Sequence, residues 1–145
     1  TPLPPPPQHS SAASDVYKRQ AEKSGIGDRI TFTGNRLDIR DWMVASEAVF
    51  NLSNDPPEAF GRTVLETLCL GCPMIAWNHG GAAEILAEMF PQGAVGLLDY
   101  QQLEARTREF LDTRPMVQES DAFSLLESMN KHLAVYDDLM RDQHK

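Results

Sequence analysis

Two acidic residues, Glu58 and Glu66, are separated by seven residues, and the pattern between them predicts the start of a helix. Gly61 opens that helix, with Arg62 and Thr63 in its first turn. The free amides and positive dipole end of a helix N-terminus suit a diphosphate, and a glycine allows its close approach. Carboxylates accept hydrogen bonds from hydroxyl groups. The spacing therefore predicts a site in which amides bind a diphosphate, Glu66 binds a ribose and Glu58 binds a sugar.

Short apolar runs alternate with amphipathic runs through the middle of the chain, and these are the elements that must position the site. Strands are expected at 30–33, 48–53, 73–77 and 93–98, and helices at 39–43, 61–70, 80–90 and 100–112. This alternation favours βαβ units, and hence an α/β fold with a Rossmann-like parallel sheet and flanking helices. Ligands of such open sheets bind outside the carboxyl ends of the strands. The loop 54–60 is expected to leave the sheet at that edge.

Residues at the ends of these runs support the assignment. Gly25 and Gly71 each follow a helical run, where glycine is a typical stop signal. Asp99 precedes the run 100–112 and has the side chain of a typical N-cap. The short apolar run 48–53 is typical of a strand that is buried on both faces.

The two ends of the chain differ in pattern from its middle. Residues 1–20 are rich in proline, then in serine and alanine. We expect a disordered arm there, or a sequence-assembly artefact, because part of the arm resembles translated adapter sequence. Residues 114–145 are expected to form a long amphipathic helix, with an apolar stripe of Leu126, Met129, Leu133, Tyr136 and Met140. The ligand-binding domain is then expected to span 21–113.

The composition of the 145 residues is that of a soluble globular domain, with a net charge of -8. An acidic chain is a poor nucleic-acid ligand, because phosphate contacts need clustered lysine and arginine. We see no apolar run of membrane-spanning length and no secretory leader. A cytoplasmic protein is expected.

The cysteines Cys69 and Cys72 form a C-x-x-C pattern, which can mark a redox pair or half of a zinc site. The sequence holds no second cysteine pair, and the pattern lies at the end of a predicted helix rather than at its start. A low thiol pKa is typical of the start. We therefore interpret both residues as small buried apolar residues.

The segment "PEAFGRTVLETLCLGCPMIA", followed by "GGAAEIL", resembles the donor-binding signature of retaining GT-B glycosyltransferases of the large family four. Met74 stands where that signature usually has valine, a change that preserves most of the volume. The resemblance implies the C-terminal, donor-binding half of a GT-B fold. The matching residues are Glu58, Phe60, Gly61, Glu66, Gly71, Pro73, Gly80, Gly81 and Glu84.

The resemblance implies a role for each residue around the predicted helix start. Glu58 would contact the hydroxyl groups of the transferred sugar, and it is the expected catalytic residue. The backbone of Phe60 and Gly61 would line that sugar, while Arg62 and Thr63 would offer amides to the diphosphate.

Further positions follow from the same resemblance. Glu66 would bind the ribose, and the backbone of Asn35 and Arg36 would meet the nucleobase. The loop that faces the acceptor would be shaped by the second motif, Gly80, Gly81 and Glu84.

In enzymes of this kind a glycosyl group moves with retention of anomeric configuration, and the resemblance implies neither a metal nor any other cofactor. The basic Arg/Lys pair of the family would lie upstream of Ala21, together with an N-terminal acceptor domain. The complete enzyme is expected to be a transferase, able to associate with the inner face of the membrane through that domain. The present chain alone is expected to be inactive.

Other interpretations remain open. The chain could be a binding module that holds a nucleotide without catalysis, or part of a GT-B sugar-nucleotide epimerase. Glu66 could be an ordinary solvated helix residue, and Glu58 could only balance the helix dipole. The E-x-F-G motif together with the seven-residue spacing favours glycosyl transfer.

Overall fold

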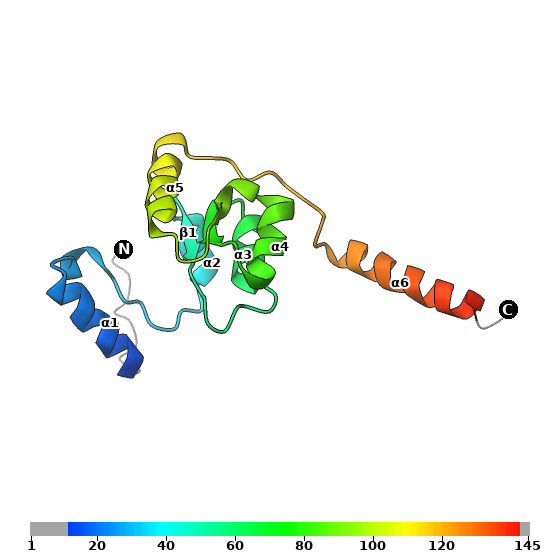
Figure 1. The fold of residues 1–145 in the computed structure, drawn as a ribbon, viewed down its shortest axis with the longest axis horizontal. Coiled ribbons are helices and arrows are strands. Elements are labelled where there is room, and N and C mark those ends of the chain that lie inside the picture. Colours follow the sequence, from blue (N-terminus) through cyan, green and yellow to red (C-terminus); the bar gives the residue numbers. More distant parts are fainter. Residues whose placement is uncertain (1–11, 143–145) are drawn as a thin grey trace. The chain divides into compact units, whose positions relative to one another are not determined.

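A computed structural model describes residues 12–142, and the contacts divide the chain into two compact units, Thr1–Ile39 and Arg40–Lys145. The first unit contains helix α1 (Ala12–Lys23) and a 3-10 turn, η1 (Gly27–Arg29) (Figure 1). Gly25, with a φ of +69°, adopts the left-handed conformation that ends a helix, as predicted.

Two predictions for the first unit are wrong. Residues 12–20, expected to be either disordered or a sequence-assembly artefact, are helical and form most of α1, which contradicts the first of these alternatives. The remainder of that arm, 1–11, lies outside the described residues. The strand expected at 30–33 pairs with no strand in the part of the chain that the structure describes, and Ile30 is 39% exposed. Alternating β-branched residues favour a strand, but a strand forms only where a neighbour pairs with it.

The second unit is built on a parallel three-stranded sheet, as the alternating pattern predicted, with the strand order β1-β2-β3. These strands are shorter than expected: β1 (Val49–Asn51), β2 (Met74–Trp77) and β3 (Ala94–Val95). The prediction that β1 is buried on both faces is wrong, because Phe50 is 43% exposed on this edge strand. Since the strands are parallel, their carboxyl ends share one edge.

Helices cover both faces of this sheet. From residue 39 onward the helices are α2 (Ile39–Val44), α3 (Arg62–Cys69), α4 (Gly80–Met89), α5 (Tyr100–Thr113) and α6 (Leu125–Asp142), with the 3-10 turn η2 (Pro91–Gly93) after α4. Helices α3 and α4 lie side by side on one face of the sheet, and α5 lies on the other (Figure 1). This is the layered arrangement of a Rossmann-like α/β fold.

The ends of the helices follow the sequence signals. Asp99 caps α5, because its Oδ1 accepts a hydrogen bond of 2.9 Å from the amide of Gln102. Gly61 (φ +78°) precedes α3 and Gly71 (φ +75°) follows it, both in the left-handed region that favours glycine. Helix α3 is thereby fixed at both ends.

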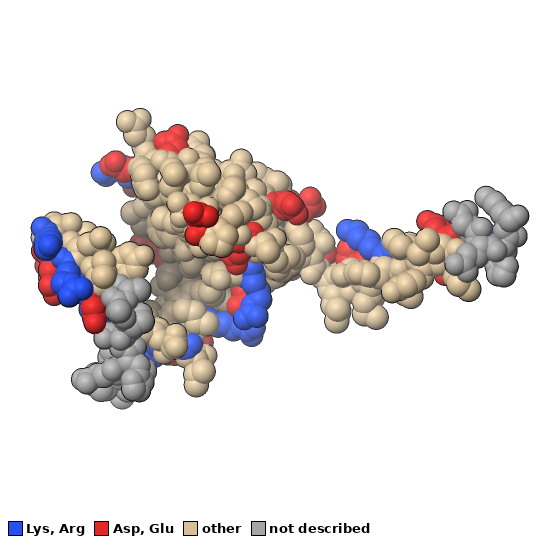
Figure 2. Space-filling model, turned by 60° about the horizontal axis from the view of Figure 1, so that its bottom comes forward, with Lys and Arg blue, Asp and Glu red and all other residues tan. Residues whose placement is uncertain are grey.

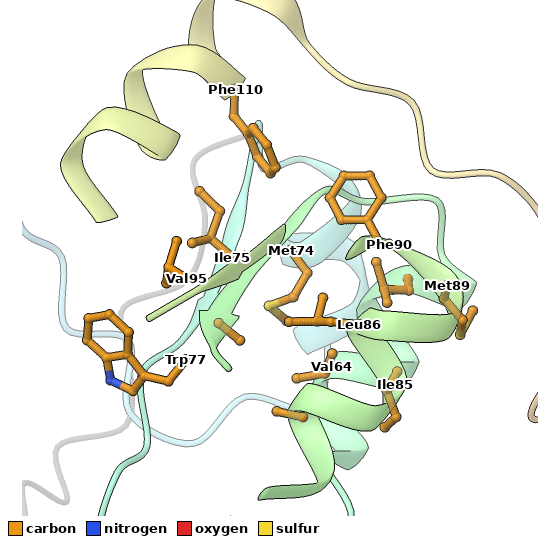
Figure 3. Close-up of a cluster of buried hydrophobic side chains, with 13 residues drawn as sticks. Val64, Met74, Ile75, Trp77, Ile85, Leu86, Met89, Phe90, Val95 and Phe110 are labelled. Carbon is orange, nitrogen blue, oxygen red and sulfur yellow. The ribbon is translucent and has the colours of Figure 1, made fainter. Parts of the chain in front are cut away.

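The core lies between the sheet and its helices, and all four residues of β2 are buried (Figure 3). Met74 points toward Leu86 of α4, whereas Ile75 lies on the side of α5 (Figure 3). The rings of Phe90 and Phe110 meet edge to face, with their centroids 5.6 Å apart. Such burial is the main stabilising contribution to the second unit.

Helix α6 confirms the predicted C-terminal helix, although it begins at Leu125 rather than at the expected residue 114. Its apolar side chains are exposed in the described chain, for example Leu126 at 70% and Tyr136 at 64%. No helix among residues 12–142 is both long and apolar enough to cross a membrane.

The prediction of two buried cysteines is half right. Cys72 is buried, and Cys69, the last residue of α3, is exposed. The error arises because Cys69 lies on the exposed side of α3, away from the buried Val64 and Thr67, whereas Cys72 follows the helix and lies in the core. Burial raises the pKa of the Cys72 thiol above its ordinary value.

Candidate functional site

Two hydrogen bonds hold the loop between β1 and α3, one at its start and one at Glu58. The indole Nε1 of Trp77 donates a hydrogen bond of 3.0 Å to the main-chain oxygen of Leu52, just beyond β1. The side-chain amide of Asn51, the last residue of β1, donates from Nδ2 to Oε2 of Glu58 at 2.5 Å. Glu58 therefore lies at the carboxyl edge of the sheet, where ligands of such folds bind.

The same loop packs directly on the first turn of α4. The amide of Gly81 donates a 2.9 Å hydrogen bond to the main-chain oxygen of Glu58. A Cβ atom on Gly81 would lie 2.6 Å from the main-chain oxygen of Ala59, and one on Gly80 would lie 2.6 Å from that of Glu58. Glycine is thus required at both positions, because the backbone of α4 and that of the Glu58 loop lie too close together for a side chain.

Gly61 completes this packing at the start of α3. It is buried, and a Cβ atom on it would lie 3.0 Å from the amide nitrogen of Ala82. Within residues 12–142 no side chain caps α3, so in this part of the chain the first-turn amides of Arg62 and Thr63 have neither an intrahelical carbonyl nor a side-chain partner. Such amides at the positive end of a helix dipole can bind an anion.

Glu66 lies one turn further along α3 and pairs with Arg62, with Nε and Oε1 3.2 Å apart. The Arg62 side chain is 82% exposed and that of Glu66 32%, so this is a surface ion pair that contributes little to stability. Both side chains, and that of the exposed Thr63, can therefore turn to a ligand. Phe60 is also exposed, next to Gly61.

The structure brings together most of the predicted donor-binding residues. Glu58, Phe60 and Gly61 pack against Gly80 and Gly81, and the first turn of α3 follows directly. Glu84 lies one turn beyond Gly80, on the exposed side of α4.

Asn35 and Arg36, predicted at the nucleobase, belong to the first unit, so the site described here consists of residues of the second unit alone. Within its own unit Arg36 forms a bidentate ion pair with Asp38, at 2.7 Å and 2.5 Å. These hydrogen bonds raise the pKa of the Arg36 guanidinium, which stays charged.

Asn51 is the residue that sequence reasoning missed. Its signal is an amide inside the otherwise apolar run of β1, where a polar side chain needs a partner. The partner, Glu58, is seven residues away across an irregular loop, so no periodicity connects the two.

Charged side chains of both signs are interspersed on the face of the molecule shown in Figure 2, and much of that face is uncharged. The site itself combines two acidic side chains with the amides of a helix start. Hydroxyl groups suit the first feature and phosphate oxygens the second.

Comparison with known proteins gives the family. The sequence model of the family described as "Glycosyl transferases group 1" matches residues 10–124. A curated relative is the lipopolysaccharide core biosynthesis mannosyltransferase LpsB of Rhizobium meliloti (strain 1021), which is 28% identical over 146 residues. That alignment covers 92% of this chain and 40% of the relative, so the chain spans less than half the relative's length. Because the family match covers most of the sequence, this chain belongs to the group 1 glycosyl transferases.

Proposed function

We propose that this chain is the donor-binding half of a retaining GT-B glycosyltransferase, which moves a hexosyl group from a nucleoside-diphosphate sugar to an acceptor. The observation that supports it most is the packing of the Glu58 loop on Gly80 and Gly81 beside the uncapped start of α3. The family match supports the same reaction class.

In this proposal the donor lies along the carboxyl edge of the sheet. The first-turn amides of Arg62 and Thr63 bind the diphosphate, and Glu66 exchanges its pairing with Arg62 for hydrogen bonds to the ribose. Glu58 accepts hydrogen bonds from hydroxyl groups of the sugar. The sugar is held by Glu58 through its hydroxyl groups, and the diphosphate to which it is bonded is held by the helix amides. Together these contacts limit the motion of the sugar relative to the diphosphate.

The helix start also serves the chemistry. As the glycosidic bond to the diphosphate breaks, negative charge develops on the departing phosphate oxygens. The helix amides already point at these phosphate oxygens, so they stabilise the charge without reorganising. In other enzymes a divalent cation neutralises the same charge. We propose that transfer by the complete enzyme requires no metal, with the family's upstream basic pair completing the charge balance.

The remaining roles are also proposals. The backbone of Asn35 and Arg36 meets the nucleobase, and the segment from Gly80 to Glu84 faces the acceptor, which the N-terminal domain of a longer, cytoplasmic protein would bind. The relative's name reports a mannosyltransferase of lipopolysaccharide core biosynthesis, so a mannosyl donor is the first to test.

An NMR titration of the ¹⁵N-labelled chain tests the donor site. GDP-mannose, UDP-glucose and ADP-glucose are added in turn, with free mannose as a control for the sugar alone. The largest amide shifts are expected at Gly61, Arg62 and Thr63, because the diphosphate binds there. Shifts concentrated elsewhere, or equal shifts with free mannose, would contradict the proposal.

A further inference from the structure

We propose that Asn51 is a positioning residue for Glu58: it fixes one oxygen of the carboxylate so that the other faces the donor sugar. This inference rests on the proposed role of Glu58. Asn51 itself has no contact with the donor in this proposal, and it acts only through the carboxylate that it orients.

The amide of Asn51 is oriented at both of its ends. Its Oδ1 accepts a hydrogen bond of 3.2 Å from the main-chain amide of Ser53, and its Nδ2 donates to Oε2 of Glu58 at 2.5 Å. The side-chain amide thus uses its oxygen as an acceptor and its nitrogen as a donor, toward two different partners. The contact with Ser53 therefore decides which end of the amide meets Glu58.

The strand that carries Asn51 is itself fixed. Alternation along β1 places Asn51 on the same face as Val49, which packs against the core, and opposite the exposed Phe50. Asn51 pairs in register with Ala76, and the next residue, Leu52, accepts the hydrogen bond from Trp77. The amide is thus presented from a strand end that is paired in register and followed by a hydrogen-bonded residue.

The backbone of Glu58 is held separately from its carboxylate. The main-chain oxygen of Glu58 accepts from the amide of Gly81, so backbone and side chain have separate anchors on α4 and β1. Among the described residues, Oε1 of Glu58 has no hydrogen-bond partner. A carboxylate with one oxygen already fixed loses less conformational freedom when the other accepts a sugar hydroxyl.

The substitution Asn51→Asp tests whether the amide positions Glu58, because it replaces the amide by a carboxylate of nearly the same size. The new side chain still accepts from Ser53, but it turns a carboxylate oxygen toward Glu58 and repels it. We expect the affinity for GDP-mannose to fall about tenfold, with the affinity for GDP changed less than about twofold. UDP-glucose and UDP form a second ligand pair. Asn130→Asp, on the exposed surface of α6, is the control that adds the same charge elsewhere.

A double-mutant cycle separates positioning from a general loss of structure. If Asn51 acts through Glu58, then Asn51→Asp should have almost no further effect on GDP-mannose binding in a Glu58→Ala background. Additive losses, equal losses for GDP and GDP-mannose, or an unchanged affinity of Asn51→Asp would overturn the inference. Should Asn51→Asp not fold, Asn51→Ala is carried through the same cycle.

The outcomes also distinguish this inference from the function on which it rests. If Glu58→Ala weakens GDP-mannose binding and Asn51→Asp does not, only the positioning role is wrong. If Glu58→Ala affects GDP and GDP-mannose equally, or the unmodified chain binds no ligand of either pair, the proposed function fails and the role of Asn51 fails with it.

Discussion

The amide of Gly81 donates a 2.9 Å hydrogen bond to the main-chain oxygen of Glu58, joining the start of α4 to the loop before α3. The two residues come from the two motifs that the sequence singled out. Their contact is between backbones, so it depends on the absence of a side chain at Gly81 rather than on the chemistry of one.

The substitution Gly81→Ala should therefore disturb both stability and binding. Its Cβ would lie 2.6 Å from main-chain atoms of Ala59 and Phe60, and they can give way only if the loop moves. We expect a loss of about 1–3 kcal/mol in the free energy of unfolding, measured by urea denaturation, and weaker binding of GDP-mannose. Gly96→Ala is the control, because its nearest contact would be 3.4 Å. An equal loss in both variants would contradict the prediction.

Glu66→Ala should weaken the binding of the nucleoside diphosphate by about 1–3 kcal/mol, because hydrogen bonds between a carboxylate and the ribose are lost. Stability should hardly change, since the ion pair with Arg62 is exposed. Glu104→Ala breaks an ion pair of the same spacing, with Arg108 on α5, and should leave binding intact. Calorimetric titration with GDP and UDP measures the difference, and an unchanged affinity of Glu66→Ala would remove its ribose role.

Glu58→Gln should reduce the affinity for a nucleotide sugar more than that for the bare nucleotide. Glutamine keeps an oxygen that can accept from Asn51, so the loop is preserved, whereas the charge that strengthens hydrogen bonds to sugar hydroxyls is lost. Parallel titrations with GDP-mannose and GDP give the two affinities. Comparable losses for both ligands would place Glu58 outside the sugar subsite.

The two cysteines should differ in reactivity. Burial raises the pKa of Cys72, so less thiolate is present at a given pH than for an ordinary cysteine, and its reaction with a disulfide reagent should require a higher pH. Cys69 is exposed and should react first at pH 8. Stopped-flow measurements on Cys69→Ser and Cys72→Ser assign the two phases. Ligand binding should be unaffected in Cys69→Ala combined with Cys72→Ala, and redox-dependent binding would refute the structural role.

Phe110→Ala should destabilise the second unit by about 3–5 kcal/mol, because a fully buried ring against Phe90 is replaced by a cavity. Leu111→Ala, at the next position of α5, removes a side chain that is 47% exposed and should cost less than about 1 kcal/mol. Urea denaturation followed by circular dichroism compares the two. Similar midpoints would show that α5 contributes little to the core.

The features predicted most reliably from the sequence were those set by local backbone conformation, such as the ends of helices. Gly25 and Gly71 end their helices in left-handed conformations, and Asp99 caps α5 through its side chain, as expected. These features depend on local geometry, which leaves a residue-level signature.

Features that depend on a distant partner were predicted less well. The alternation at 30–33 and the exposure of Phe50 depend on which strands are neighbours in space, and periodicity carries no information on that. The hydrogen bond from Asn51 to Glu58 depends on the path of a loop without regular structure. The sequence could show both residues but not their contact.

The close approach of the Glu58 loop to α4 also has a consequence for engineering. Exchanging residues 53–61 for those of another family member, in order to change donor preference, would bring in a backbone shaped for a different partner helix. Such a graft should succeed only when the first turn of α4 is transplanted with it, because the two segments form one inseparable piece of the fold.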